Sequence, residues 1–166
     1  VQAMVAEQMP EAADAGLGVK AHLFDRIDVG KVMADAHHVE HGFGVIFYRL
    51  EELLAALRRD ADLAPARLRS KKYLSTSLLI IDEVGFEPMT RQEASLFFRL
   101  VSYRYQRGSI LITTNKGIRD WPEILAGDEV LTTAILDRLL HNSHVLDIKG
   151  RSYRLRDLER LVAQQA

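Results

Sequence analysis

Short apolar runs separated by polar turns dominate the pattern of this chain. Residues 78–81 form a continuous apolar run that ends in two acidic residues, and residues 109–113 form a second apolar segment. Runs of this kind are typical of parallel strands that are buried on both faces of a sheet. Further strands are predicted at residues 21–24, 45–48 and 144–148.

Between these runs the apolar residues take a helical spacing. An apolar residue every three or four positions predicts helices over residues 31–41, 50–59 and 131–141. Thr90 and Glu93 have the spacing of a capping box, which predicts the start of another amphipathic helix. Because strands alternate with helices, we expect an α/β fold with a central, mainly parallel sheet.

The composition limits the classes of function. The 166 residues include no cysteine, which excludes disulfides, thiolate zinc sites and thiol nucleophiles. The net charge is −1, so any contact with nucleic acid must come from local basic patches. No apolar run approaches the roughly 20 residues that a membrane helix needs, and we expect one cytoplasmic domain without a membrane span.

Asp82 and Glu83 follow directly after the apolar run at 78–81. In an open parallel sheet ligands bind beyond the carboxyl ends of the strands, so these two carboxylates lie where chemistry is expected. Asp82 would hold Mg²⁺ through a water, and Glu83 would orient and deprotonate the water that attacks the γ-phosphate of a nucleotide. The alternative is that the two acids only solvate the end of a strand.

Two further residues fit the same chemistry. Asn115 ends the second buried strand, from which its amide would hydrogen-bond the γ-phosphate or the attacking water. Arg138 lies in a predicted helix, and its guanidinium would reach a transition-state phosphate in its own or an adjacent subunit. An Asx turn is the alternative for Asn115. An exposed helical arginine is the alternative for Arg138.

Residues 25–32 lie where a phosphate-binding loop is expected, between a predicted strand and a predicted helix. Such a loop reads G-x-x-x-x-G-K-[ST], in which glycines let backbone N–H groups surround the phosphates and the hydroxyl binds Mg²⁺. Gly30 and Lys31 match this pattern, whereas Asp25 replaces the first glycine and Val32 replaces the hydroxyl residue. Repulsion between a carboxylate and a neighbouring triphosphate weakens the binding free energy by roughly 1 kcal/mol in water and by about 4 kcal/mol at an effective dielectric constant of about 20. We therefore expect ATP and Mg²⁺ to bind weakly or not at all through this loop.

Two groups of basic residues are candidates for contacts with DNA phosphates. They are Arg67, Arg69, Lys71 and Lys72 in the middle of the chain and Arg151 and Arg154 near its carboxyl end. Solvated helix faces explain the same residues equally well.

Taken together, residues 45–54, 78–115 and 135–155 resemble the IstB-like helper ATPases of DNA transposition, AAA+ proteins related to the helicase loader DnaC. The resemblance covers about two-thirds of the chain. It implies a three-layer P-loop NTPase fold of the AAA+ type with little or no lid domain. It also makes residues 78–83 the Walker B strand and residues 25–32 a degenerate Walker A loop.

The same resemblance assigns roles to the candidate residues. Asp82 and Glu83 look like the Walker B pair, Asn115 looks like the sensor 1 residue, and Arg138 looks like the arginine finger that acts across a subunit interface. The family implies ATP-dependent homo-oligomers that wrap DNA and recruit or activate a transposase.

We expect a poorly defined segment at residues 1–20, an AAA+ core at 21–154 and a carboxyl-terminal helix at 155–166. Because the likeness is poor before residue 41 and the chain starts with Val1, we expect a truncated or decayed copy. Two alternatives stay open. One is a non-hydrolysing, AAA+-shaped interaction module, and the other is a DnaC-like helicase loader in DNA replication.

Overall fold

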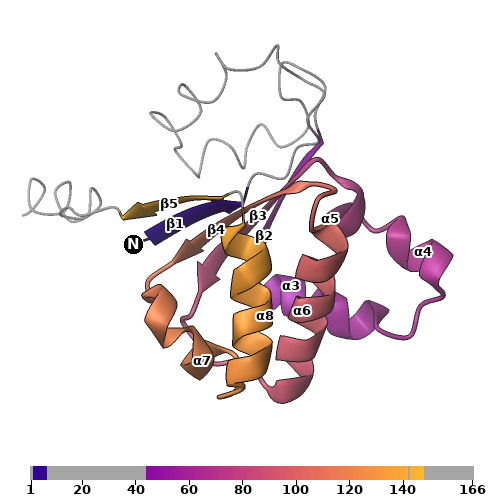
Figure 1. Ribbon diagram of the computed structural model, residues 1–166. Helices are drawn as coiled ribbons and strands as arrows, with labels where there is room; N and C mark the ends of the chain where they lie inside the picture. Colours follow the sequence, from indigo (N-terminus) through magenta and orange to yellow (C-terminus); the bar gives the residue numbers. More distant parts are fainter. Residues whose placement is uncertain (1, 7–43, 142, 148–166) are drawn as a thin grey trace, which may run out of the picture.

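The computed structural model describes residues 2–6, 44–141 and 143–147, and Figure 1 labels their helices and strands. Part of the prediction lies outside the described residues. This part comprises the strand at 21–24, the helices at 31–41 and 155–166, the Walker A residues Gly30, Lys31 and Val32, and the basic residues Arg151 and Arg154.

The described strands form one sheet in the order β2-β3-β4-β1-β5. Their bounds are Gln2–Ala6 for β1, Val45–Arg49 for β2, Leu78–Val84 for β3, Ser109–Thr114 for β4 and Ser143–Asp147 for β5. The pairs β2–β3 and β3–β4 are parallel, as predicted. β1 is antiparallel to both β4 and β5, so β5 points the same way as β4. The mainly parallel sheet is therefore confirmed, with β1 as a reversed strand that the sequence did not predict.

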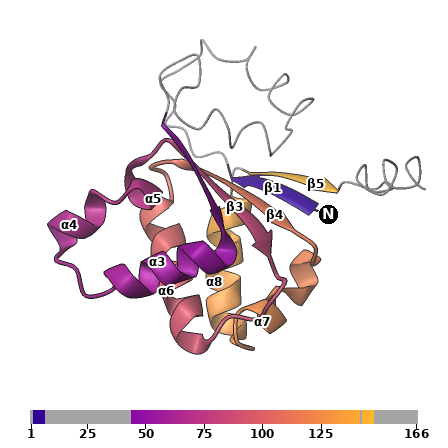
Figure 2. The same ribbon diagram turned by 180° about the vertical axis from the view of Figure 1, so that it is seen from behind.

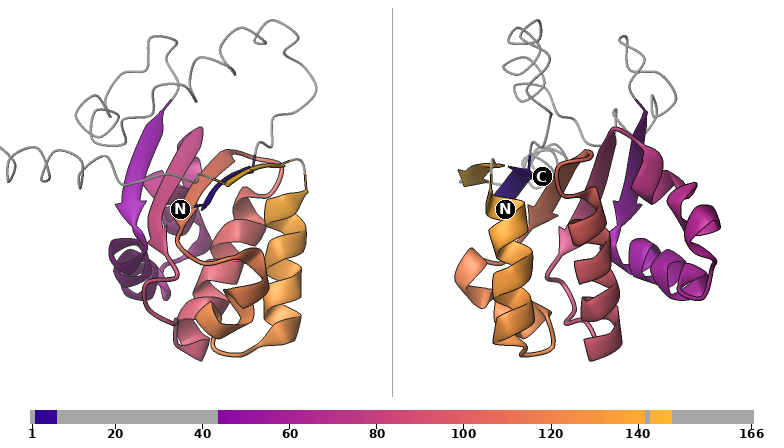
Figure 3. Two further views of the ribbon diagram at one scale, coloured as in Figure 1. Left: turned by 90° about the vertical axis from the view of Figure 1, so that its left-hand side faces the viewer. Right: turned by 45° about the vertical axis from the view of Figure 1, so that its right-hand side comes forward.

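The helices of the described residues lie on one side of this sheet, and α4 projects away from it (Figures 1 and 3). They are α3 (Leu50–Asp60), α4 (Pro65–Arg69), α5 (Lys72–Ser75), α6 (Arg91–Arg104), α7 (Trp121–Ile124) and α8 (Glu129–Leu140), with a 3₁₀ turn at Ile118–Asp120. Seen from behind, β2 leads directly into α3 (Figure 2). Because α6 contacts both α3 and α8, the three long helices form a continuous layer.

The core lies between this helical layer and the sheet. Ile81 and Ile112 face the helices and are at most 1% exposed, and Phe97 of α6 and Ile135 of α8 cover them. Ile80 and Leu111, the residues just before these two, lie on the opposite face, because successive residues of a strand point to opposite faces of the sheet. None of the helices in the described part of the chain is long and apolar enough to cross a membrane.

The opposite face of the sheet carries a smaller apolar cluster. Ile80 and Leu111 are its buried members, and Val45, Phe47 and Leu78 pack against them. Among the described residues only strand residues take part in this cluster. The described residues therefore form two layers, the sheet and the helices on one side of it.

Arg104, at the end of α6, is buried where β3 and β4 begin. Its side chain is 1% exposed, and its two terminal nitrogens donate to four backbone carbonyl oxygens at 2.8 to 3.3 Å, those of Tyr73, Thr76, Ser77 and Ser109. A Cβ at Gly108 would lie 2.7 Å from Nη2 of Arg104, so a larger residue at this position would force the guanidinium to shift. Burial lowers the pKa of Arg104 to about 10, and the side chain stays charged at neutral pH. One cation thus ties the starts of two strands together.

Candidate functional site

Asp82 and Glu83 form a β-bulge at the carboxyl end of β3. The parallel register runs regularly to the pair Ile81–Ile112 and resumes at Val84–Thr114, so two residues of β3 lie opposite one residue of β4. Glu83 takes a left-handed backbone with φ of 64°. This conformation costs a residue with a side chain roughly 1 to 2 kcal/mol. Strain of this kind is common at functional sites, where the surrounding contacts hold it in place.

Thr113 is the residue of β4 that lies opposite the bulge. Its hydroxyl donates a short hydrogen bond to Oδ1 of Asp82 and accepts one from the backbone N–H of Glu83 at 3.2 Å. One side chain therefore contacts both acidic residues. Thr113 is not among the residues that the sequence predicts for this site. Once the two strands are predicted to pair in parallel, a threonine at the end of the strand next to Asp82 is a usable signal.

The carboxylate of Glu83 is held loosely. Its side chain is 48% exposed and lies 3.8 Å from Nε of Arg49, the last residue of β2, whose side chain is 63% exposed. Such an exposed and long ion pair adds little stability. The carboxylate is therefore accessible to water and to a ligand at this edge of the sheet.

Asn115 follows β4 directly and is exposed. It lies two residues beyond Thr113, so the structure brings Asn115 to the same edge of the sheet as Asp82 and Glu83. The predicted neighbourhood of these three residues is observed. Their chemical roles stay predictions.

A glycine brings the two loops at this edge into contact. Gly85 has φ of 97°, and a Cβ there would lie 2.8 Å from Cγ of Lys116 and 2.9 Å from Cδ1 of Ile124. The turn after the acidic pair can therefore lie against the segment after β4 only with glycine at this position. The next residue, Phe86, is 69% exposed.

The donor set at the bulge suits a magnesium ion shared with phosphates. The described residues contain no group of three or more His, Cys, Asp or Glu side chains that could enclose a metal. Mg²⁺ is usually bound by one or two carboxylates, several waters and substrate phosphates, so a single half-buried carboxylate fits this mode. Within the described part of the chain the donor to Asp82 is Thr113, which reaches Oδ1 and leaves Oδ2 for a metal-bound water.

Arg138 lies at the other end of the domain. It sits in the last turn of α8, which ends just before β5 begins, and β5 points the same way as β4. Its Nη1 donates to the carbonyl oxygen of Ala134 at 2.6 Å, and its guanidinium packs 5.0 Å from the centre of the Phe98 ring. The fold therefore does not bring Arg138 to Asp82 within one chain. Its action across a subunit interface stays a prediction.

The candidate DNA-binding residues within the described part of the chain differ in exposure. Arg67, Arg69 and Lys72 are exposed on α4 and α5. Lys71 instead donates to Oδ1 of the buried Asp60 at 3.0 Å. Burial alone would raise the pKa of Asp60, but hydrogen bonds from Lys71 and Tyr73 lower it. Lys71 is thus largely committed to the protein's own core.

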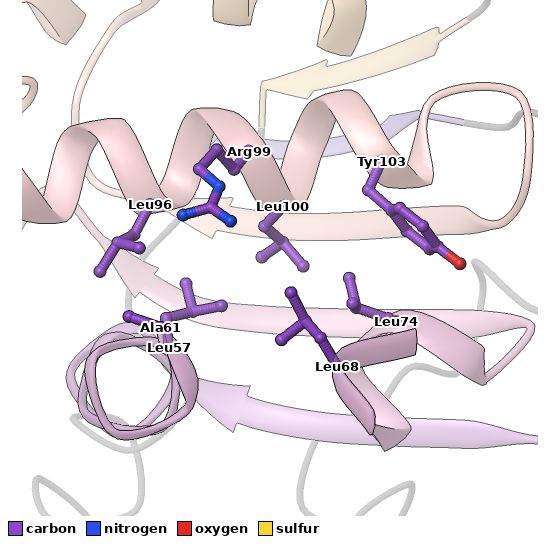
Figure 4. Close-up of a pocket in the computed structure, with 8 residues that line it drawn as sticks. All are labelled: Leu57, Ala61, Leu68, Leu74, Leu96, Arg99, Leu100 and Tyr103. Carbon is purple, nitrogen blue, oxygen red and sulfur yellow. The ribbon is translucent and has the colours of Figure 1, made fainter. Parts of the chain in front are cut away.

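A small groove lies beside these basic residues, between α6 and the helices α3, α4 and α5 (Figure 4). Its volume is about 140 Å³. Apolar side chains line it, together with Arg99 and Tyr103: Leu57, Ala61, Leu68, Leu74, Leu96 and Leu100. It holds no carboxylate and is too apolar for a nucleotide phosphate, so the acidic bulge remains the candidate site.

Comparison with known proteins identifies a family. The family model described as "IstB-like ATP binding protein" matches residues 28–160. A protein of Pseudomonas aeruginosa with the name "Insertion sequence IS21 putative ATP-binding protein" is 48% identical over 119 residues, which are 72% of this chain and 44% of that protein. The corresponding IS232 protein of Bacillus thuringiensis subsp. berliner is 40% identical over 111 residues, which are 67% of this chain and 44% of that protein.

This chain therefore spans about half the length of the curated relatives that it matches. Two solved structures are also similar. A DnaC helicase loader is 21% identical with a TM-score of 0.45 and covers 58% of this chain and 59% of its own. A DNA replication initiation factor is 14% identical with a TM-score of 0.47 and covers 67% of this chain and 32% of its own. The sequence matches, and not these weaker structural ones, identify the family.

Proposed function

Because this chain belongs to the IstB-like ATP binding protein family, we propose that it binds ATP with Mg²⁺ and that Asp82 and Glu83 provide the hydrolytic half of the site. The observation that carries the proposal is the bulge at the end of β3. It places one half-buried and one exposed carboxylate at the edge of a parallel sheet, beside Asn115. Edges of this kind are where nucleotide phosphates bind in α/β proteins.

The two carboxylates have different surroundings and therefore different roles. Asp82, half-buried and hydrogen-bonded, would hold a hydrated Mg²⁺, which would neutralise phosphate charge. Glu83, exposed, accepts a hydrogen bond from the attacking water and takes its proton. The amide of Asn115 orients the same water or the γ-phosphate. Arg49, 3.8 Å from Glu83, forms only a long, exposed ion pair with it, which leaves the carboxylate accessible to this water.

Replacing Glu83 tests this role. In Glu83→Gln the backbone and the side-chain size are kept but the proton acceptor is lost, so kcat for ATP hydrolysis falls by roughly 100-fold or more while ATP binding is retained. The matched control is Glu87→Gln, because Glu87 is an exposed glutamate in the turn that follows the same strand. Hydrolysis is measured as phosphate release with Mg²⁺. Equal rates for Glu83→Gln and the unmodified chain would refute the assignment of Glu83.

The non-hydrolysing interaction module is the second candidate, and Asp25 and Val32 are the observation that favours it. Titration with a fluorescent ATP analogue and Mg²⁺ separates the two. Saturable binding by the unmodified chain supports the ATPase. Binding that appears only after Asp25→Gly combined with Val32→Thr supports the module, because the acid end of the site is then intact and only the phosphate loop has lost its function.

The role of this ATPase is to assist a transposase on DNA as a homo-oligomer. The relatives are named as ATP-binding proteins of insertion sequences, which are mobile DNA, and Arg67 and Arg69 offer an exposed basic surface on α4. DNA binding that is independent of sequence and weakens steeply with salt is the expected result. A role as a helicase loader would instead require binding to a replicative helicase.

Two double variants test the DNA surface, and each of them removes two positive charges. Arg67→Ala with Arg69→Ala lowers the slope of log affinity against log salt by roughly 1 to 2, since each lost phosphate contact removes about 0.9. Arg91→Ala with Arg119→Ala removes two exposed arginines from other elements and is the control. Equal slopes for the two double variants would remove α4 from the DNA surface.

A further inference from the structure

Thr113 occupies a unique place in the sheet. It is the single residue of β4 opposite the two-residue bulge of β3, and its hydroxyl bonds to both of them although they lie 31 and 30 residues away in the chain. The register on either side of this point, Ile81–Ile112 and Val84–Thr114, is that of an ordinary parallel pair. The bulge is therefore local, and the side chain of Thr113 contacts both of its residues.

A hydroxyl is well suited to hold such a bulge. As a donor it bonds to the carboxylate of Asp82, and as an acceptor it satisfies the backbone N–H of Glu83, which the bulge removes from the regular ladder. The left-handed backbone of Glu83 costs roughly 1 to 2 kcal/mol and needs compensating contacts. Slippage of the strand by one residue would turn every following side chain to the opposite face of the sheet.

We propose that Thr113 is the positioning residue of this site, which rests on the function proposed for Asp82 and Glu83. Its hydroxyl fixes the bulge, aims the carboxylate of Asp82 and sets the direction in which Glu83 leaves the strand. Thr113 itself does not touch the reacting atoms. Valine has the same shape without the hydroxyl, and serine has the hydroxyl without the methyl group, so the two substitutions separate positioning from packing.

The first experiment needs no nucleotide. Amide hydrogen exchange by NMR on the full chain reports the bond from the Glu83 N–H. In Thr113→Val this amide exchanges about tenfold faster or more, in Thr113→Ser it stays within about twofold of the unmodified chain, and the amide of Leu79 in the regular ladder is unaffected. Thr132→Val is the control, because it removes a threonine hydroxyl that bonds to the carbonyl oxygen of Asp128, the N-cap residue of its own helix. Unchanged exchange at Glu83 in Thr113→Val overturns the proposal.

The second experiment measures ATP hydrolysis. Thr113→Val lowers kcat about tenfold or more while KM stays within about twofold, Thr113→Ser restores most of kcat, and Thr113→Val adds little further loss to Glu83→Gln, since both act on one step. Full activity of Thr113→Val, or no rescue by serine, overturns positioning. If the unmodified chain does not hydrolyse ATP, the proposed function fails, and the exchange experiment still decides whether Thr113 holds the bulge.

Discussion

Where β3 and β4 begin, the charged side chains of Arg104 and Asp60 are buried and hydrogen-bonded, whereas at the edge where these strands end the carboxylate of Glu83 is exposed and loosely held. At the first edge Arg104 donates to four carbonyl oxygens, and Asp60 accepts from Lys71 and Tyr73 at 3.0 Å each. At the second edge Glu83 has a strained backbone and one ion pair at 3.8 Å.

Within this one pair of strands, the residues at the starts stabilise the fold and the residues at the ends form the candidate site. A buried charged side chain with several hydrogen bonds holds its surroundings in one arrangement. Loss of these hydrogen bonds would leave buried polar groups unpaired, which costs free energy. A reactive carboxylate must instead remain accessible to water and phosphate. The same two strands are thus tied at their starts and left open at their ends.

Arg104→Met should have the largest effect. It leaves four carbonyl oxygens without their donor, and we expect a loss of about 3 to 5 kcal/mol in the free energy of unfolding. Denaturant titration followed by the fluorescence of Trp121, the single and fully buried tryptophan, measures this loss. The control is Arg107→Met, which removes an exposed arginine three residues later and should cost less than about 1 kcal/mol. Equal losses for the two variants would show that Arg104 does not tie the strands.

Asp60→Asn should have an intermediate effect that depends on pH. The pKa of Asp60 is below its ordinary value, so the ionised carboxylate stabilises the fold above about pH 4, and this stability is lost as pH falls through the lowered pKa. We expect Asp60→Asn to cost about 1 to 3 kcal/mol at neutral pH and progressively less below about pH 4. Asp62→Asn, at an exposed position two residues later, is the control. A difference that does not change with pH would contradict the role of the charge.

Glu83→Gly should have the smallest effect and the opposite sign. Relief of the left-handed strain outweighs the entropy that glycine adds to the unfolded chain, so the fold gains about 0.5 kcal/mol. Glu87→Gly lies in the same turn without a positive φ and should lose about 0.5 to 1 kcal/mol. Both are measured by the same denaturant titration. A loss in Glu83→Gly as large as that in Glu87→Gly would mean that the backbone at Glu83 is not strained.

Much of this fold could be predicted from local pattern. The apolar runs at 78–81 and 109–113 became β3 and β4, and the capping box was found as predicted, with the Thr90 hydroxyl accepting from the N–H of Glu93 at 3.3 Å. The placement of Asp82 and Asn115 at one edge followed from the parallel pairing of these strands. These features depend on residues within a few positions of each other, or on the general rule that parallel strands end together.

Other features could not be predicted because they depend on contacts between distant residues. Lys71 looked like a DNA-binding residue in the sequence, but the fold places it 3.0 Å from Asp60. β1 occupies the sheet position between β4 and β5 in the reversed direction, and Gln2 pairs with Thr114. β1 therefore begins beside the carboxyl end of β4 and ends beside the start of β4, far from Asp82. No local period in the first residues encodes this pairing partner.

The sequence by itself determined that an acidic pair follows a buried parallel strand, because alternation, caps and apolar runs are local properties of the chain. Only the tertiary structure decided how this pair is presented: the bulge, the left-handed Glu83 and the hydroxyl of Thr113 that bonds to both acids. The physical reason is that a bulge arises from a mismatch between two strands. It exists only once residues 30 positions apart have paired.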